Sequence, residues 1–192
     1  MEKKFMKVLR GTQSSADPAL FYKVDDVTIA QHWCPAEEDP VTMGGFSIAT
    51  EKALIRWIFR GTVLYDVVIP DDAEIVYPKN PFVEGEIARV NKLILVNPRP
   101  MTDEIALQLY TTSIFSHREY YKILAGCAVM GYAKTCEAIL NNHISPANAK
   151  QCLDDFAAFI NPEIWPSPDG GLTYKTVITI LRNFAQIAEY NK

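Results

Sequence analysis

Long apolar runs are missing from this sequence of 192 residues. None reaches the roughly 18 to 20 residues that a helix needs to span a bilayer. The charged start of the chain has no apolar segment behind it, so we expect no secretory signal. The 19 basic residues are scattered and face 23 acidic ones, which leaves no basic stripe to follow a phosphate backbone. We therefore expect neither a membrane nor a nucleic acid as partner, and a cytoplasmic location.

Cysteine and histidine are sparse and irregularly spaced. The sequence holds no CxxC pair, and no histidine lies at a ligand interval beside a cysteine. We expect reduced, buried thiols, no disulfide framework and no metal site. The residues concerned are Cys34, Cys127, Cys136, Cys152, His32, His117 and His143.

Composition and patterning predict two parts. Hydrophobic residues make up 48% and charged residues 22%, which is ordinary globular composition with enough material for a core. Short β-rich runs dominate up to residue 100, and helical periodicity dominates after it. We expect an α+β domain over 1–100, with a small bent or split mixed sheet and one packed helix. A helical domain over 101–192 should dock on it, because its apolar stripes need a partner.

The expected elements follow from apolar runs and from capping residues. Five strands are predicted at 5–9, 20–24, 63–69, 74–77 and 91–96, and a further one begins after the glycine pair Gly44-Gly45. One helix is predicted over 50–60, with Thr50 as its cap and Gly61 in a left-handed exit. Beyond residue 100, helices are predicted from 102 or 103 onward, after Ser116, over 133–140, after Ser145 and over 174–190.

Two passages of the first half resemble an uncharacterised domain of large DNA viruses and phages. The first runs from Gly44 through the strand after the glycine pair and the following helix. The second is the valine-rich strand that ends in Ile69-Pro70-Asp71-Asp72-Ala73, with 91–95 after it. In those proteins the domain often precedes ankyrin-type helix pairs, and 121–140 resembles one such unit. The resemblance implies a viral or phage protein that meets a host protein.

The same half is more loosely similar to the ADP-ribosyltransferase fold. The residues that carry this similarity are Arg10-Gly11, the strand that contains Ser47, and Glu84-Gly85-Glu86. The similarity implies that NAD binds as a substrate, with no metal. Arg10 and Gly11 would hold its phosphates and ribose.

The resemblance gives the other residues their expected roles. Gly45 and Ser47 would shape the nicotinamide pocket. Glu86 would stabilise the oxocarbenium-like ribose, and Glu84 would orient or deprotonate the acceptor. A fixed carboxylate suits this role, since positive charge develops on the ribose as the glycosidic bond breaks. The match is partial, because Ser47 is followed by Ile-Ala-Thr rather than Thr-Ser, and the Glu-x-Glu pair reads as a loop.

The sequence therefore predicts two alternative functions from different classes. The first is an NAD-binding, ADP-ribosyltransferase-like protein that acts on host components, either active or catalytically silent. The second is a non-enzymatic adaptor that engages a host protein through the ankyrin-like helical half, with Tyr132 and Trp165 on the recognition surface. The sequence names neither the acceptor nor the oligomeric state.

Overall fold

A computed structural model gives the structure of the chain. It describes residues 3–14, 17–79, 83–116, 119–160 and 170–190. The chain divides into two units, each treated by itself below. The α+β unit comprises residues 1–55, 60–101 and 112–114, and the helical unit comprises 56–59, 102–111 and 115–192. The docking expected from the sequence stays a prediction.

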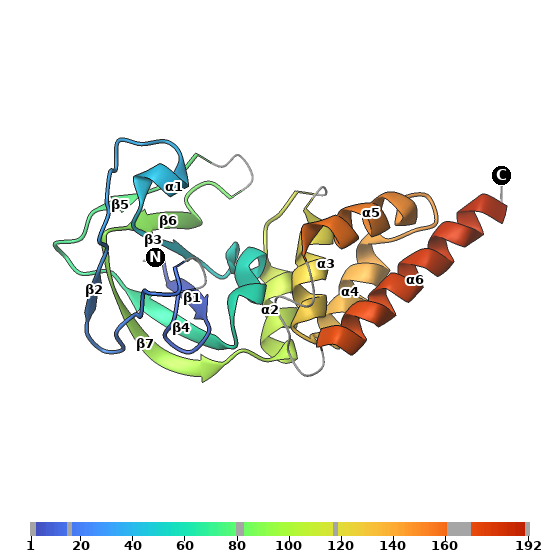
Figure 1. Cartoon of the computed structure of the whole chain (residues 1–192), viewed down its shortest axis with the longest axis horizontal. Coiled ribbons are helices and arrows are strands. Elements are labelled where there is room, and N and C mark those ends of the chain that lie inside the picture. The colour runs from blue at the N-terminus through green and yellow to red at the C-terminus, as the bar shows by residue number, and fades with distance from the viewer. Residues whose placement is uncertain (1–2, 15–16, 80–82, 117–118, 161–169, 191–192) are drawn as a thin grey trace. The chain divides into compact units, whose positions relative to one another are not determined.

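The α+β unit is built on one seven-stranded sheet (Figure 1). The strand order is β2-β7-β4-β1-β3-β6-β5, and every pairing between these strands is antiparallel. This confirms the expected α+β class. The strands are β1 (Phe5–Leu9), β2 (Val27–Ile29), β3 (Phe46–Ala49), β4 (Val63–Val68), β5 (Ile75–Val76), β6 (Ile87–Val90) and β7 (Lys92–Pro100).

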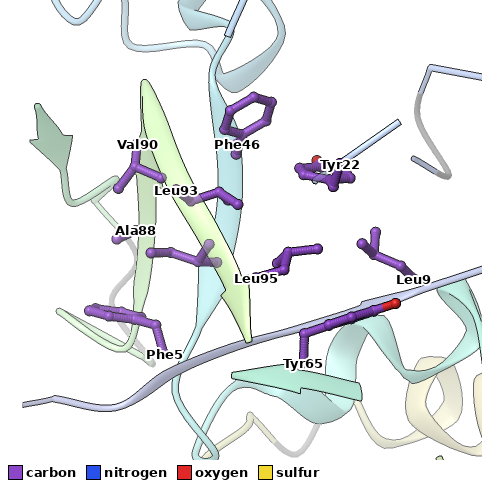
Figure 2. Packing of buried hydrophobic residues seen from close by; sticks show 10 residues of the cluster. Phe5, Leu9, Tyr22, Phe46, Tyr65, Ala88, Val90, Leu93 and Leu95 are labelled. Carbon is purple, nitrogen blue, oxygen red and sulfur yellow. The ribbon is translucent and has the colours of Figure 1, made fainter. Parts of the chain in front are cut away.

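The sheet is bent around its core at the junction of β6 and β7. Only Asn91 separates these two strands, yet they are not neighbours in the sheet. Strand β6 pairs with β3 and β5, whereas β7 pairs with β2 and β4. Side chains of both strands enter one buried cluster, so the two halves of the sheet face the same core (Figure 2). The cluster consists of Phe5, Leu9, Tyr22, Phe46, Ile48, Tyr65, Ala88, Val90, Leu93 and Leu95.

Two short helical segments accompany the strands. They are α1 (Pro40–Met43) and the 3-10 helix η1 (Leu54–Arg60). The predicted helix over 50–60 is thus shorter and tighter than expected, and Thr50 does not cap it, because its hydroxyl donates to Glu86 instead. Gly61 was expected to take a left-handed conformation, but its φ of 170° is extended. A glycine is required there for another reason: a Cβ would lie 2.0 Å from the carbonyl carbon of Leu9.

Five longer helices lie in the part of the helical unit that the structure describes. They are α2 (Asp103–Thr112), α3 (Tyr120–Val129), α4 (Ala133–His143), α5 (Ala149–Phe159) and α6 (Gly170–Tyr190). Phe156 is fully buried and stacks on Tyr174, with ring centroids 4.7 Å apart. Arg56 donates two hydrogen bonds to the Glu119 carboxylate, at 3.1 and 3.0 Å. None of the described helices combines the length and apolarity that crossing a membrane requires.

Candidate functional site

The strands that carry the candidate residues are neighbours in the sheet. Strands β1, β3 and β6 are consecutive in the strand order. Arg10 directly follows β1, Ser47 lies within β3, and Glu86 directly precedes β6. Glu84 and Glu86 lie in a turn, as the sequence predicts, and Glu86 directly precedes β6, a strand that the sequence patterns do not predict.

The β3–β6 ladder joins Ser47 and Glu86 on one pair of strands. In the register, Ser47 is opposite Arg89 and Ala49 is opposite Ile87. The ladder continues one step further, where the Thr50 amide donates to the Glu86 carbonyl at 2.9 Å. Ser47 and Glu86 therefore lie about 10 Å apart along the strand direction, at 3.3 to 3.4 Å per residue.

Arg10 lies at the other end of β1 from Glu86. Strands β1 and β3 pair at Met6 and Ala49. Glu86 is beside the N-terminal end of β1, where the Lys3 ammonium is 3.9 Å from its carboxylate. The seven residues from Lys3 to Arg10 span about 23 Å of extended chain. The structure thus brings Ser47 and Glu86 onto one ladder and does not bring Arg10, or Gly11 beside it, to Glu86.

Glu86 is held by a hydroxyl and two ammonium groups. Its side chain is only 15% exposed. It accepts a hydrogen bond from the Thr50 hydroxyl at 2.5 Å, and Thr50 is itself buried. Lys3 and Lys52 form ion pairs with it at 3.9 and 3.8 Å. Fixed in this way, the carboxylate has the low mobility that electrostatic stabilisation of a transition state demands.

A pocket opens beside this carboxylate. It is lined by Lys3, Tyr77, Pro78, Lys79, Glu84 and Gly85. Tyr77 is 46% exposed, and the Lys3 ammonium lies 5.7 Å from its ring centroid. The lining therefore offers an exposed aromatic ring, two cations and the second candidate glutamate. An aromatic face accepts a stacked base or nicotinamide, and the two ammonium groups suit phosphate oxygens.

The Gly44-Gly45 turn is fixed from two sides. Both glycines have positive φ, 72° and 68°, which confirms the turn that the glycine pair predicts. A Cβ at Gly45 would lie 2.5 Å from the ring of Trp33. Arg89 donates to the carbonyls of Gly44 and Gly45 and to the Ser47 hydroxyl, at 2.7, 3.2 and 2.8 Å. The Ser47 hydroxyl is thus already engaged by an arginine that the sequence reasoning did not single out.

Lys7 is a buried charge that the sequence reasoning also missed. It lies on the core face of β1 between Phe5 and Leu9, and is 8% exposed. Its ammonium donates to the Ser47 carbonyl at 2.7 Å and lies 5.0 Å from the centroid of the Tyr22 ring. Burial, with the positive charges of Arg60 and Arg89, lowers the pKa of Lys7 to about 7. The period-two alternation of Phe5, Lys7 and Leu9 was the available signal.

The lowered pKa of Lys7 predicts a pH-dependent stability. The pKa of lysine in the unfolded chain is about 10.4, so from pH 7 to 10 the unfolded chain holds a proton that the folded chain has released. This group should therefore make the free energy of unfolding rise with pH over that range, by at most about 1.4 kcal/mol per unit, and contribute no slope below pH 7. Urea unfolding of wild type and Lys7→Met at pH 6, 7, 8 and 9 measures the effect.

The matched control for this measurement is Lys4→Met, because Lys4 is exposed. The free energy of unfolding of wild type minus that of Lys7→Met should increase as the pH rises. The same difference between wild type and Lys4→Met should not change with pH. Parallel stability curves for wild type and Lys7→Met would show that the amine keeps its proton in the folded state.

Three of the four cysteines are buried as expected, and Cys34 is exposed. Burial raises the pKa of the Cys152 thiol to about 11 and raises that of Cys127 and Cys136 as well. These thiols therefore stay protonated and unreactive at neutral pH. In the described part of the chain, no three His, Cys, Asp or Glu side chains are grouped so that they could hold a metal ion.

The recognition surface predicted for the adaptor is wrong at Tyr132. This side chain is 6% exposed. It packs inside the helical unit just before α4, and its amide donates to the Cys127 carbonyl at 3.0 Å. Trp165 lies outside the described residues.

Comparison of the chain with protein-family models, with curated proteins and with solved structures gave no match.

Proposed function

We propose that the α+β unit binds NAD beside the β3–β6 ladder and acts as an ADP-ribosyltransferase-like protein. One observation carries the proposal: Glu86 directly precedes β6, the strand that pairs with the one that bears Ser47, and its carboxylate accepts a hydrogen bond from the Thr50 hydroxyl. The closeness of Glu86 to the start of a strand supports the role that the resemblance gives it. The viral or phage origin and the host acceptor stay predictions of that resemblance.

The chemistry assigned to Glu86 is electrostatic. Cleavage of the bond between ribose C1′ and the nicotinamide nitrogen returns the electron pair to the ring, so nicotinamide leaves as a neutral molecule. The ribose gains positive charge as this bond lengthens, and a fixed carboxylate stabilises that charge more than it stabilises bound NAD. An acceptor nucleophile then bonds to C1′ and loses its proton, for which the exposed Glu84 in the pocket is the available base.

The phosphates of NAD are assigned to lysines rather than to Arg10. Arg10 lies at the far end of β1, whereas Lys3 and Lys79 line the pocket beside the glutamates. The Tyr77 ring in the same pocket would stack on one of the two heterocycles of NAD. This reassignment keeps the expected substrate and changes the residues that hold it.

Tyr77→Ala is expected to weaken NAD binding about five- to hundredfold, because stacking on an aromatic ring contributes about 1 to 3 kcal/mol per base. Isothermal titration of the full chain with NAD, from micromolar to millimolar concentrations, measures this. The matched control is Phe21→Ala, since Phe21 is 60% exposed in the same unit and does not line the pocket. Absence of NAD binding at millimolar concentrations would show that the proposed function is wrong. Equal NAD affinities of wild type and Tyr77→Ala would show that NAD does not bind in this pocket.

The adaptor is the competing function from the sequence. It predicts that the full chain retains a host protein without any need for NAD. The NAD titration separates the two, because a pure adaptor gives no NAD-dependent heat. The burial of Tyr132 removes half of the surface first assigned to the adaptor.

A further inference from the structure

Lys3 contacts three groups at the pocket beside Glu86. Its ammonium donates a hydrogen bond to the Gly85 carbonyl at 2.5 Å and lies 3.9 Å from the Glu86 carboxylate. It also lies over the Tyr77 ring, 5.7 Å from the ring centroid, which is within the range of a cation–π contact. Lys3 therefore occupies the aromatic face and the carboxylate that NAD would use in the proposed function.

The charge of Lys3 opposes the role proposed for Glu86. The ammonium groups of Lys3 and Lys52 approach the same carboxylate oxygen, Oε1, whereas the Thr50 hydroxyl donates to Oε2. A positive charge beside Oε1 repels the positive charge that develops on the ribose. While Lys3 stays in place, Glu86 is therefore a weaker electrostatic stabiliser.

The contacts of Lys3 can be exchanged for contacts to a phosphate. Its distance to Glu86 exceeds hydrogen-bond range, and its hydrogen bond to Gly85 goes to a neutral carbonyl. The side chain is 44% exposed, and lysine carries three rotatable donors on a flexible stem. A phosphate oxygen offers a charge-assisted hydrogen bond, which is about twice as strong as one to a neutral acceptor. A bound pyrophosphate should therefore draw the ammonium away from Glu86.

From these contacts we infer that Lys3 couples the binding of a nucleotide pyrophosphate to the release of Glu86. When pyrophosphate binds, the Lys3 ammonium moves to the phosphate oxygens and uncovers the Tyr77 ring. Glu86 then keeps Thr50 and Lys52 as its partners. The inference rests on the proposed function, since it concerns the same pocket, and it adds a rule of substrate choice: nicotinamide riboside, which has no phosphate, leaves Lys3 on Glu86.

The first test follows the Lys3 side-chain nitrogen and the Gly85 carbonyl carbon by NMR in the full, isotope-labelled chain. ADP, which carries a pyrophosphate but no nicotinamide, is expected to shift both signals saturably, because the hydrogen bond between the two groups breaks. Nicotinamide riboside should leave the Lys3 nitrogen at its free position. The matched reference is Lys92, which pairs with Asp72 at 2.5 Å and does not line the pocket.

Release of nicotinamide from NAD and from nicotinamide riboside gives a second readout. Lys3→Met should raise KM for NAD about tenfold, as loss of one charge-assisted hydrogen bond predicts, and leave kcat nearly unchanged. The same variant should cleave nicotinamide riboside about two- to fivefold faster than wild type, the effect expected of an exposed ion pair. Lys92→Met should behave as wild type with both substrates.

A Lys3 nitrogen that stays at its free position while NAD shifts the Tyr77 signals overturns the inference and leaves NAD binding intact. Slower cleavage of both substrates by a folded Lys3→Met also overturns it, because that result indicates a structural role only. If NAD binds without being cleaved, the NMR comparison decides. Absence of NAD binding removes the proposed function, and this inference with it. Near-ultraviolet circular dichroism checks that each variant is folded.

Discussion

Gly61→Ala is expected to lower the free energy of unfolding by about 3 kcal/mol or more. An added Cβ would lie 2.0 and 2.1 Å from the carbonyl carbon and oxygen of Leu9, and 2.4 Å from the amide nitrogen of Arg10. These are backbone atoms at the end of β1, so no side-chain rotation relieves the clash. The end of β1 or the segment around Gly61 must move instead. Urea unfolding measures the loss.

Gly171→Ala is the matched control. Gly171 lies in α6, and a Cβ there meets nothing within 4 Å. Alanine favours a helix over glycine by about 0.5 to 1 kcal/mol, so this change should be neutral or stabilising. If Gly61→Ala unfolds at the same urea concentration as wild type, the close approach of Gly61 to Leu9 is not present in solution.

Glu86→Gln is expected to lower NAD-dependent transfer by about a hundred- to thousandfold, the usual cost of losing one electrostatic stabiliser of a transition state. The amide keeps the size of the side chain and can still accept from the Thr50 hydroxyl, so folding should persist. NAD affinity should change only severalfold, because the carboxylate acts mainly on charge that develops in the transition state. Transfer of label from adenylate-labelled NAD to proteins of a cell lysate measures the rate.

The control for this prediction is Glu51→Gln. Glu51 is exposed and lies one residue after Thr50, so its loss removes the same charge without touching the site. Labelling by wild type and Glu51→Gln that disappears in Glu86→Gln supports catalysis. Equal labelling by all three proteins excludes Glu86 as the stabilising group. NAD binding without labelling by wild type indicates the catalytically silent form.

Strands with strong local patterns could be predicted from the sequence. Phe5–Leu9 and Val63–Val68 alternate or concentrate apolar residues, and both appear as β1 and β4. Strand β6 is only four residues long and includes Arg89, so its local signal is weak. The segment 20–24 looks like a strand in isolation, but it contributes only single bridges at Phe21 and Val24, and the strand forms at Val27–Ile29.

The candidate site depends on contacts that are distant in sequence. Glu86 meets Thr50 and Lys3 only because β3 pairs with both β1 and β6, and such register is decided by the whole sheet. The same pairing separates Arg10 from Glu86. The register of β3 with β6 also places Arg89 opposite Ser47. The glutamates and the serine could be selected as candidates from the sequence. The cations that surround them could not be predicted, because they come from strands that are distant in sequence.

NAD binding beside the β3–β6 ladder is tested directly by titrating the full, ¹⁵N-labelled chain with NAD and following its backbone amide chemical shifts. We expect saturable shifts at Thr50, Tyr77, Gly85 and Glu86, the residues that surround the pocket and the end of the β3–β6 ladder. Amides of the helical unit far from these residues in sequence, such as Ala157 in α5, should not move. Saturable shifts confined to the helical unit, or no shifts at millimolar NAD, would show that the α+β unit does not bind NAD at this pocket.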